Sequence, residues 1–295
     1  MMALTNELYR VLAGAGFDIR DIRPLSCGDD SDAYLCDDVY VMKVPKREAV
    51  KKTQALEFQL YRFLESFSFP CEIPKVIYQG EAFNMMTYIK GERLAYENYH
   101  KLSEKEKDRL ACDEAEFLKA LHSVEIPDSH PLYSELKLEV KDRFLQDQKN
   151  LLTILKAEKL LTPGRQAWVE RIYRDLLDMD FLFAYRPCLT HNDYSADNML
   201  YQKNRLTGVI DFGDAVIGDP DNDFLCLLDN STDDFGKDFG RRVLRYYGHP
   251  HPELAERKAE INDAYWPVQQ ILLGHSRKEA QLFEEGIRDL ETVRF

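Results

Sequence analysis

The spacing of hydrophobic residues changes along the chain, from short apolar runs near the N-terminus to helical stripes further on. Residues 19–45 contain two apolar-rich runs, Ala33–Cys36 and Val39–Val44, and Asp37 and Asp38 separate them as a hairpin turn would. Two further short strands are predicted over 76–79 and 84–89. Between these pairs of strands, a helix is predicted from about 47 to 67, because its apolar positions have helical spacing: Leu56, Leu60, Phe63, Leu64 and Phe67.

Helix signals dominate after residue 91. Ser103-x-x-Glu106 has the form of a capping box that opens a helix. Helices are also predicted over 136–160 and 163–178, the second opened by Thr162-Pro163. A loop and hairpin are predicted over 186–215, followed by helices to the C-terminus.

A short helix is predicted at the start of the chain. Thr5 is its expected N-cap, and Gly14 and Gly16 end it.

These elements predict an α+β fold of two lobes, with a cleft between them as the natural ligand site. We expect a small β-rich N-terminal lobe over 1–88 and a larger, mainly helical lobe over 89–295. Within the larger lobe, the pattern separates three parts: a helical insert at about 92–185, a core at 186–224 and C-terminal helices at 225–295.

Composition narrows the classes of function. The 295 residues include 39 lysines and arginines against 52 aspartates and glutamates, a formal net charge of −13. Such a chain is not expected to bind nucleic acids or anionic membranes, since both present negative surfaces. A cationic ligand is compatible with this charge if the acidic residues gather in one place.

The cysteines and the apolar runs indicate a cytoplasmic protein. No apolar run of about 18 residues is present, and the first residues lack the pattern of a signal peptide. None of the six cysteines forms a CxxC pair or a Cys/His cluster, so neither zinc nor a disulfide framework is expected. We also expect a monomer.

The most informative segment lies between residues 189 and 224. His191-x-Asp193 is followed by Asn198, and Asp211-Phe212-Gly213 begins thirteen residues later. This is the arrangement of protein kinases, in which one aspartate accepts the proton of the attacked hydroxyl, and an asparagine and a second aspartate hold Mg²⁺. Asp193 is therefore the predicted base, and Asn198 and Asp211 are the predicted metal ligands.

The N-terminal lobe has candidates for nucleotide binding. Lys43 lies in a predicted strand, as the lysine that pairs with the nucleotide phosphates should. Glu57, on the next helix, is its predicted partner, and Glu65 on the same helix is the rival. The loop over 26–32 has a single glycine, Gly28, but its backbone and the Ser31 hydroxyl can contact phosphate.

The connection between the lobes is the predicted site of the purine. Backbone groups of Thr87 and Ile89 are placed to bond its edge, and Met86 is expected behind the base.

Aspartates crowd the segment 188–238. It contains eleven aspartates, no glutamate and three basic residues, so it has a net charge of −8. Metal binding needs only two or three carboxylates. Asp219 and Asp223 are expected to have structural roles, while Asp233 and Asp234 either cap a helix or bind a substrate ammonium group. The predicted substrate contacts are Asp193, Ser195, Asp214, Asp233, Asp234 and Trp266, with Tyr265 and Trp266 either packing on a sugar or filling the core.

The chain resembles the aminoglycoside phosphotransferase family, a branch of the protein-kinase-like fold that also includes choline kinases. The resemblance rests on the segments 191–198 and 210–224, HNDYSADN and IDFGDAVIGDPDNDF. Further phrases, SCGDDSDAYLC, YIKGERL, LSEKEK and NDAYW, are similar to the aminoglycoside 2''-phosphotransferases. Asn192 departs from the family, in which glycine is common at this position.

The resemblance implies transfer of the γ-phosphate of ATP or GTP to a hydroxyl, the 2''-hydroxyl, of an aminoglycoside such as kanamycin, tobramycin or gentamicin, which confers antibiotic resistance. Three alternatives stay open: a choline-type kinase for another amino alcohol, a silent nucleotide-binding relative, and a protein kinase. The intact Lys43, Asp193, Asn198 and Asp211 count against a silent relative, and the lack of an APE-type segment after Asp211 counts against a protein kinase.

Overall fold

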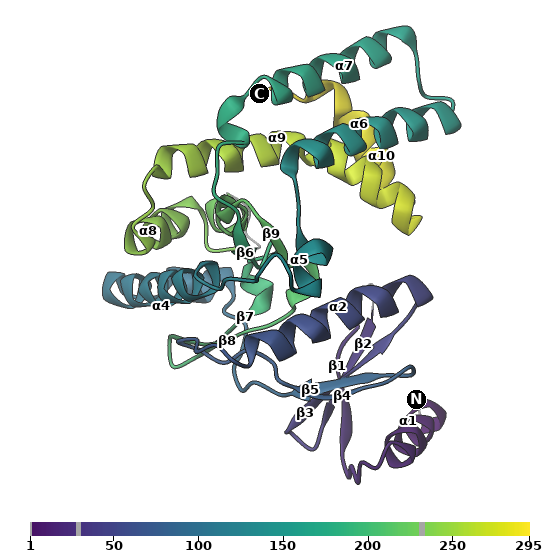
Figure 1. Ribbon diagram of the computed structural model, residues 1–295, viewed down its shortest axis with the longest axis vertical. Helices are drawn as coiled ribbons and strands as arrows, with labels where there is room; N and C mark the ends of the chain where they lie inside the picture. The colour runs from purple at the N-terminus through teal and green to yellow at the C-terminus, as the bar shows by residue number, and fades with distance from the viewer. Residues whose placement is uncertain (1, 28–30, 230–233) are drawn as a thin grey trace.

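Five antiparallel strands in the order β1-β2-β3-β5-β4 form the first part of the computed structural model, which describes residues 2–27, 31–229 and 234–295 (Figure 1). The strands are β1 (Ile22–Cys27), β2 (Ser31–Cys36), β3 (Tyr40–Pro45), β4 (Val76–Gln79) and β5 (Asn84–Thr87). The predicted hairpin is confirmed, and it turns through Asp37 and Asp38 at φ of 51° and 55°. Aspartate tolerates this left-handed region because its short side chain bonds locally.

The two faces of the sheet are covered by different helices. Alternation along β3 sends Met42 to one face and Lys43 to the other. Met42 joins a small core with residues of α1 (Met2–Gly14), whereas Lys43 faces α2 (Glu48–Leu64). Figure 1 shows α1 and α2 on opposite sides of the sheet. The prediction that Thr5 caps the first helix is wrong, because the helix already begins at Met2 and Thr5 lies inside it.

The second part of the chain is mainly helical, with two small antiparallel sheets at its centre. One sheet pairs β6 (Cys188–Thr190) with β9 (Val216–Gly218), and the other pairs β7 (Met199–Gln202) with β8 (Arg205–Val209). The helices are α3 (Tyr96–His100), α4 (Glu104–His122), α5 (Pro131–Leu136), α6 (Val140–Ala157), α7 (Pro163–Leu177), α8 (Lys237–Tyr247), α9 (Pro252–Arg277) and α10 (Ala280–Asp289). Short 3-10 turns lie at 180–182, 196–198, 212–214, 220–224, 226–228 and 290–292.

The helix signals of the sequence have mixed outcomes. Ser103 and Glu106 form the predicted capping box at the start of α4, and Thr162 accepts the N–H of Arg165 at the start of α7. The helix predicted over 136–160 is confirmed as α6, although it begins later than predicted, at Val140, because residues 137–139 after α5 do not continue a helix. Between α5 and α6 the backbone N–H of Leu138 donates to the carbonyl of Ile217 in β9, which holds the chain extended there.

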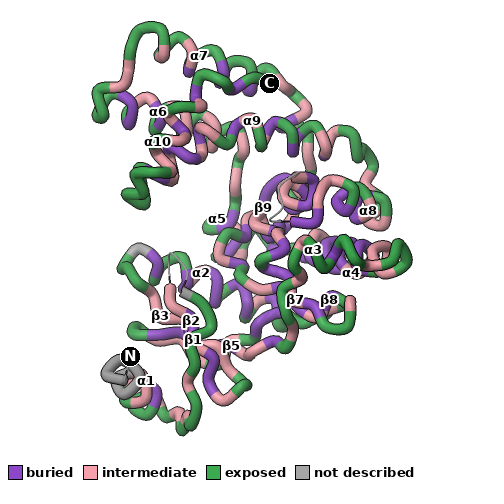
Figure 2. Tube along the Cα trace, turned by 180° about the vertical axis from the view of Figure 1, so that it is seen from behind, coloured by how far each residue is buried: buried purple, intermediate pink, exposed green. Residues whose placement is uncertain are grey.

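Two hydrophobic cores stabilise this part. The larger one runs from α2 through α4 to β6, β7 and β8, so it joins the sheet-bearing part to the small central sheets. The other lies among α6, α7, α9 and α10, the group at the top of Figure 1. Figure 2 shows buried residues around β9 and along α2 and α4, while much of α7 is exposed. The predicted fold class is confirmed; the lobe boundary at residue 88 stays a prediction, and β5 ends at Thr87.

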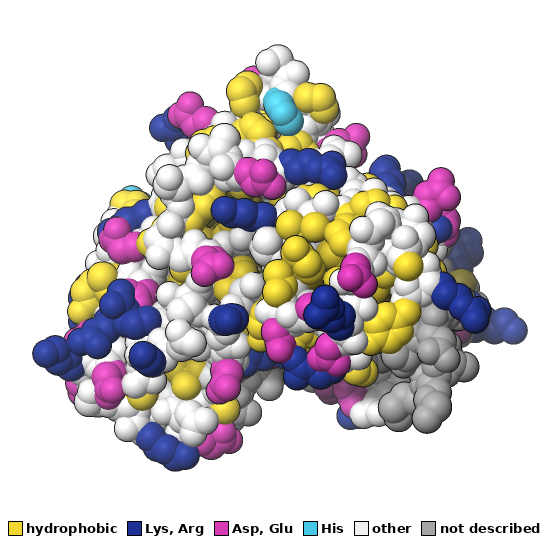
Figure 3. Space-filling model, turned by 90° about the horizontal axis from the view of Figure 1, so that it is seen from below, with side chains coloured by type: hydrophobic (Ala, Val, Ile, Leu, Met, Phe, Trp, Pro, Cys, Tyr) yellow, Lys and Arg dark blue, Asp and Glu magenta, His cyan; other side chains and the backbone are white. Residues whose placement is uncertain are grey.

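Charge on the sheet-bearing end is mixed. Figure 3 views this end, and its described Lys, Arg, Asp and Glu side chains alternate over the face. The described residues of the acidic segment identified in the sequence, 188–229 and 234–238, lie instead in the second part of the chain, around its small central sheets. None of the described helices is both long and apolar enough to cross a membrane.

Candidate active site

Lys43, on β3, contacts two carboxylates of the site. Its Nζ lies 3.0 Å from Oε1 of Glu57 on α2 and 3.1 Å from Oδ1 of Asp211, which follows β8. Burial acts to lower the pKa of Lys43, but the two carboxylates raise it above its usual value. Burial likewise opposes ionisation of Asp211, yet Lys43 holds the pKa of Asp211 below its usual value. The ammonium is thus fixed in its charged form between two elements.

The structure brings Glu57, and not Glu65, to Lys43. Glu57 is buried, whereas Glu65 is exposed and is the C-cap residue directly after α2.

Tyr61 joins α2 to the turn that carries Asp211, a link that the sequence reading missed. Its hydroxyl donates to Oε1 of Glu57 at 3.0 Å and accepts the backbone N–H of Phe212 at 3.2 Å. Its ring also meets the Phe212 ring edge-on, with centroids 5.5 Å apart. Tyr61 lies four residues after Glu57, and therefore on the same helix face. That spacing was the available signal.

Asp193 and Asn198 face each other across a tight turn after β6. Nδ2 of Asn198 donates to Oδ2 of Asp193 at 2.8 Å and to its backbone carbonyl at 2.9 Å. Burial raises the pKa of Asp193, against the opposing effects of His191 and Asn198. The Asp193 carboxylate therefore has a fixed orientation and an increased affinity for a proton, as a general base requires.

The site has a donor set that fits Mg²⁺. Because Nδ2 of Asn198 is bound to Asp193, its Oδ1 is the amide atom left for a metal, and Asp211 contributes a carboxylate. In proteins Mg²⁺ is commonly held by one or two carboxylates together with nucleotide phosphates.

A buried aspartate holds the start of the loop over residues 191–198, which is called the catalytic loop below because it carries the predicted base Asp193. Asp223 accepts the backbone N–H of His191 at 2.9 Å and that of Asn192 at 2.6 Å. Asp223 also contacts the ring of His122 on α4, whose Nε2 lies 3.0 Å from Oδ2 of Asp223. Asp223 is fully buried, so these donors replace the water that the carboxylate has lost. The structural role expected for Asp223 fits this position.

Two neighbours of Asp223 are also tied into the protein. Nζ of Lys258 on α9 lies 2.6 Å from Asp219 and 2.7 Å from Asp221. Nε2 of His249 lies 2.7 Å from the other oxygen of Asp221. These carboxylates, both nearly buried, fix the 220–224 turn to α9.

The structure does not bring Asp234 to an open site. Asp234 is 5% exposed, and its Oδ1 accepts the N–H of Ala196 in the catalytic loop at 2.6 Å. It also does not cap α8, which begins at Lys237 after Gly236. Asp233 lies outside the described residues.

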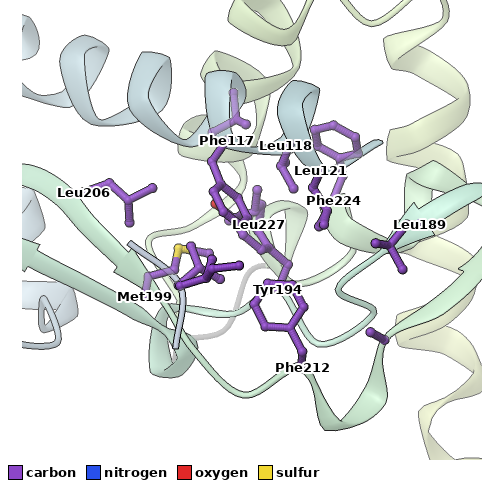
Figure 4. Close-up of a cluster of buried hydrophobic side chains, with 14 of the residues drawn as sticks. Phe117, Leu118, Leu121, Leu189, Tyr194, Met199, Leu206, Phe212, Phe224 and Leu227 are labelled. Atoms are coloured by element: carbon purple, nitrogen blue, oxygen red, sulfur yellow. The ribbon is translucent and has the colours of Figure 1, made fainter. Parts of the chain in front are cut away.

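Aromatic packing anchors the catalytic loop to α4. The Tyr194 ring stacks on Phe117 of α4, with centroids 5.9 Å apart and planes 10° apart. Figure 4 shows Tyr194 among Phe212, Met199 and Leu227. The loop is therefore packed on the main hydrophobic core through Tyr194.

A large pocket opens beside Asp193. It has a volume of about 980 Å³, and its walls come from the catalytic loop, the 222–229 segment, α6 and α9. Two arginines, Arg143 and Arg277, also line it, but carboxylates outnumber them: Asp147, Asp193, Asp214, Asp229 and Asp263. Carboxylates grouped in a concave site attract cations.

Predicted and missed residues meet in this pocket. Asp214 and Trp266 line it, and Trp266 is 45% exposed. Tyr265 instead fills the core, where its hydroxyl bonds that of Tyr173. Asp263 was missed, although it lies three residues before Trp266 and thus on the same helix face. Burial, with the nearby Asp229, raises the pKa of Asp263 to about 6.

Of the predicted substrate contacts among the described residues, Ser195 and Asp234 are not in the pocket wall. Ser195 lies in the catalytic loop, where its N–H donates to the carbonyl of Asp193 at 3.0 Å.

The predicted purine contacts lie at the end of β5. The N–H of Thr87 already donates to the carbonyl of Lys75, so it is not available to a purine. Ile89 and Met86 are buried, 2% and 4% exposed. Ser31 begins β2, opposite Pro45, while residues 28–30 of the same loop lie outside the described ones.

Comparison with known proteins agrees with this geometry. The model of the phosphotransferase enzyme family matches residues 21–259. The complex of gentamicin with APH(2")-IIa is 56% identical in sequence and has a TM-score of 0.95, covering 98% of this chain and 96% of that one. The ternary complex of streptomycin, ATP and APH(2")-IIa is 55% identical in sequence to this chain and has a TM-score of 0.94. The match covers 98% of this chain and 96% of that one.

A more distant curated relative is the aminoglycoside 3'-phosphotransferase of Salmonella typhimurium, 28% identical over 179 residues. This match covers 59% of the chain and spans about three fifths, 61%, of the length of the relative.

Proposed function

The chain belongs to the phosphotransferase enzyme family, and we propose that it transfers the γ-phosphate of ATP or GTP to a hydroxyl of an aminoglycoside. The observation that carries this proposal is the carboxylate-lined pocket that opens directly onto Asp193. Further support comes from the similarity to APH(2") structures that contain gentamicin, streptomycin and ATP. The 2''-hydroxyl as acceptor rests on this similarity and on the sequence resemblance.

Lys43 and the residues around Asp211 are proposed to hold the triphosphate. The Lys43 ammonium, fixed by Glu57, pairs with nucleotide phosphate oxygens. Asn198 Oδ1 and the Asp211 carboxylate would hold Mg²⁺, which neutralises charge on the transferred group. Ser31, Thr87 and Ile89 stay predicted nucleotide contacts, although the N–H of Thr87 is already bound to the carbonyl of Lys75.

Asp193 is the proposed base. The hydroxyl oxygen of the acceptor forms a bond to the γ-phosphorus while the bond from that phosphorus to the β,γ-bridging oxygen breaks and the nucleoside diphosphate leaves. Asp193 accepts the hydroxyl proton. Asn198 donates to Oδ2 of Asp193, which keeps the carboxylate turned in one direction during the transfer.

The ammonium groups of the substrate are proposed to bind the aspartates of the pocket. Asp214 and Trp266 keep the substrate role predicted from the sequence, and Asp229 and Asp263 join them. For Asp234 we propose support of the catalytic loop through Ala196 instead. Ser195 stays a predicted substrate contact, and the monomeric state stays a prediction.

A choline-type kinase is the second candidate. Against it stands the size of the pocket, about 980 Å³, which exceeds the need of one small amino alcohol. A silent relative is disfavoured because Lys43, Glu57 and Asp211 are assembled.

One assay tests the proposal. The purified protein is incubated with Mg²⁺ and ATP or GTP, and nucleoside diphosphate release is followed with kanamycin, gentamicin, choline or a peptide mixture. We expect acceleration by the aminoglycosides alone, and ³¹P NMR of the product identifies the acceptor hydroxyl. Acceleration by choline without any aminoglycoside would overturn the proposal. In cells, the reaction would use cytoplasmic nucleotide and would raise resistance to the drugs it modifies.

A further inference from the structure

Two pairs of side-chain amides lie among the carboxylates of the pocket. Nδ2 of Asn222 donates to Oδ1 of Asn192 at 3.0 Å, and Nε2 of Gln269 donates to Oδ1 of Asn262 at 3.3 Å. All four residues line the pocket. The first pair is of special interest because Asn192 directly precedes the base, Asp193.

The Asn192–Asn222 pair stands on a fixed backbone. Asn192 donates its own N–H to Asp223, and Asn222 donates its N–H to the carbonyl of Asp219 at 3.1 Å. Asn192 has φ of 64°, a left-handed conformation that glycine would adopt without strain. The backbone therefore needs no side chain at 192, yet it presents an amide to the pocket.

The bond between the two side chains uses the amide oxygen of Asn192 and the NH₂ group of Asn222. The NH₂ group of Asn192 and the amide oxygen of Asn222 therefore remain for a ligand. Within the described residues, Nδ2 of Asn192 and Oδ1 of Asn222 have no partner beyond the bond that joins the two side chains. If both amides were rotated by 180°, the free donor and acceptor would only exchange residues. A carboxylate can only accept and an ammonium can only donate, whereas a hydroxyl does both. The pair is thus complementary to a hydroxyl.

We propose that the Asn192–Asn222 pair is a hydroxyl-recognition site beside the base. It binds a hydroxyl of the substrate close to the one that is phosphorylated, and it disfavours an ammonium group at that point, where Nδ2 of Asn192 would face a second donor. The surrounding aspartates bind the ammonium groups. This inference rests on the proposed function and adds to it the position at which the enzyme distinguishes a hydroxyl from an amine.

The test uses a set of kanamycins that each lack one hydroxyl. For the wild-type enzyme, loss of the recognised hydroxyl should lower kcat/KM by roughly 10- to 100-fold, since a site built for a hydroxyl rejects the analogue without it. Asn192→Gly keeps the left-handed backbone and removes the amide, so the penalty for that one analogue should fall to about 2-fold or less. Penalties for the other analogues should be unchanged. Asn222→Ala should give the same pattern.

A second arm uses the kanamycin in which an amine replaces the recognised hydroxyl. Asn192→Asp replaces the donor with a carboxylate and should raise kcat/KM for this amine relative to kanamycin by roughly 10-fold. The control is Asn150→Ala, which removes the acceptor of an exposed amide pair with Gln146 on α6, outside the pocket wall. It should leave every ratio as in the wild type.

The outcomes separate this inference from the proposed function. If the wild type phosphorylates kanamycin, but each deoxy analogue has the same penalty in Asn192→Gly and in Asn222→Ala as in the wild type, the inference is overturned and the proposed function stands. If no aminoglycoside is phosphorylated, both fall. Thermal melting and nucleotide affinity of each variant show whether the fold and the donor site are intact, so that a misfolded variant is not read as lost recognition.

Discussion

The turn at 219–223 and the pocket wall both present aspartates, but their surroundings are opposite. In the turn, Asp219, Asp221 and Asp223 are nearly buried, and Lys258, His249, His122 or backbone N–H groups bind them. In the wall, Asp214 and Asp263 are exposed to the pocket. The same residue type therefore builds the scaffold in one region and lines the pocket in the other.

This difference changes the meaning of the acidic segment. Between residues 188 and 238 the chain has a net charge of −8, but the buried carboxylates of the turn are balanced inside the protein. A buried carboxylate is tolerated only with such partners. The field that attracts a cation therefore comes from the wall, and part of it, Asp147 and Asp263, lies outside the acidic segment.

The largest effect is expected where a pocket aspartate takes part in the chemistry. Asp193→Ala should lower kcat by about 10³- to 10⁴-fold, because the hydroxyl loses its proton acceptor. Nucleotide affinity should be unchanged. Steady-state kinetics and nucleotide titration measure both. The matched control is Asp197→Ala in the same loop, where the exposed carboxylate pairs with Arg93 and should matter less than 2-fold. Near-normal turnover of Asp193→Ala would remove it from the base role.

A buried aspartate of the turn should instead affect folding. Asp223→Ala leaves the N–H groups of His191 and Asn192 and the His122 ring without their acceptor, and should lower the free energy of unfolding by about 3–5 kcal/mol. Asp263→Ala, in the wall, should not lower it, because burial and the nearby Asp229 already oppose ionisation of this carboxyl group. Urea denaturation gives both values. Equal losses in the two variants would contradict the division into scaffold and wall.

Glu114 on α4 sharpens the comparison, because it is a buried carboxyl with few partners. The hydroxyl of Tyr201 donates to its Oε1, while Oε2 has no partner in the described residues. Burial raises its pKa to about 8. The folded state therefore keeps a proton that the unfolded state loses near pH 4.5, and stability falls as the pH rises between these values.

Glu114→Gln should remove that dependence. Relative to the variant, the wild type should lose about 2–3 kcal/mol of unfolding free energy between about pH 5.5 and about pH 7.5. Urea denaturation at several pH values measures this difference. Parallel pH profiles for the two proteins would show that Glu114 does not hold its proton.

The sequence predicted the parts of the site that depend on local spacing. The strand with Lys43, the helix with Glu57, and the order Asp193, Asn198 and Asp211 all follow from motif and periodicity. In the structure Lys43 contacts Glu57 and Asp211, Asn198 contacts Asp193, and the N–H of Ile210 joins the two groups by donating to the carbonyl of Asn198. The sequence did not show the break between α5 and α6, because it depends on pairing of Leu138 with distant Ile217.

Assignment of the aspartates was harder for the same reason. Whether Asp234 faces a ligand or a backbone N–H depends on where the chain places Ala196, a contact across 38 residues. Asp263 lies outside the acidic segment, so charge density did not mark it. Its spacing of three residues from Trp266 places both on one helix face, and this spacing would have marked Asp263 as a candidate once Trp266 was predicted to contact the substrate.

The smallest effect concerns the pH-dependent charge of Asp263 in the pocket wall. With a pKa of about 6, Asp263 is ionised near pH 7.5 and neutral near pH 5. Asp263→Asn should lower kcat/KM for an aminoglycoside about 5-fold at pH 7.5, the effect of one partly screened ion pair. Because kcat/KM reports the ionisation of the free enzyme, the ratio of wild type to variant should fall towards one as the pH drops through about 6.

The ratio of the two proteins is measured because protonation of those substrate amines that do not meet Asp263 changes kcat/KM of both proteins alike. Asp238→Asn, an exposed aspartate on α8 that pairs with Arg241 outside the pocket, is the control and should give a ratio near one at every pH. A ratio for Asp263→Asn that stays constant between pH 5 and 7.5 would mean that this carboxylate does not meet the substrate. The attraction would then come from the other wall aspartates.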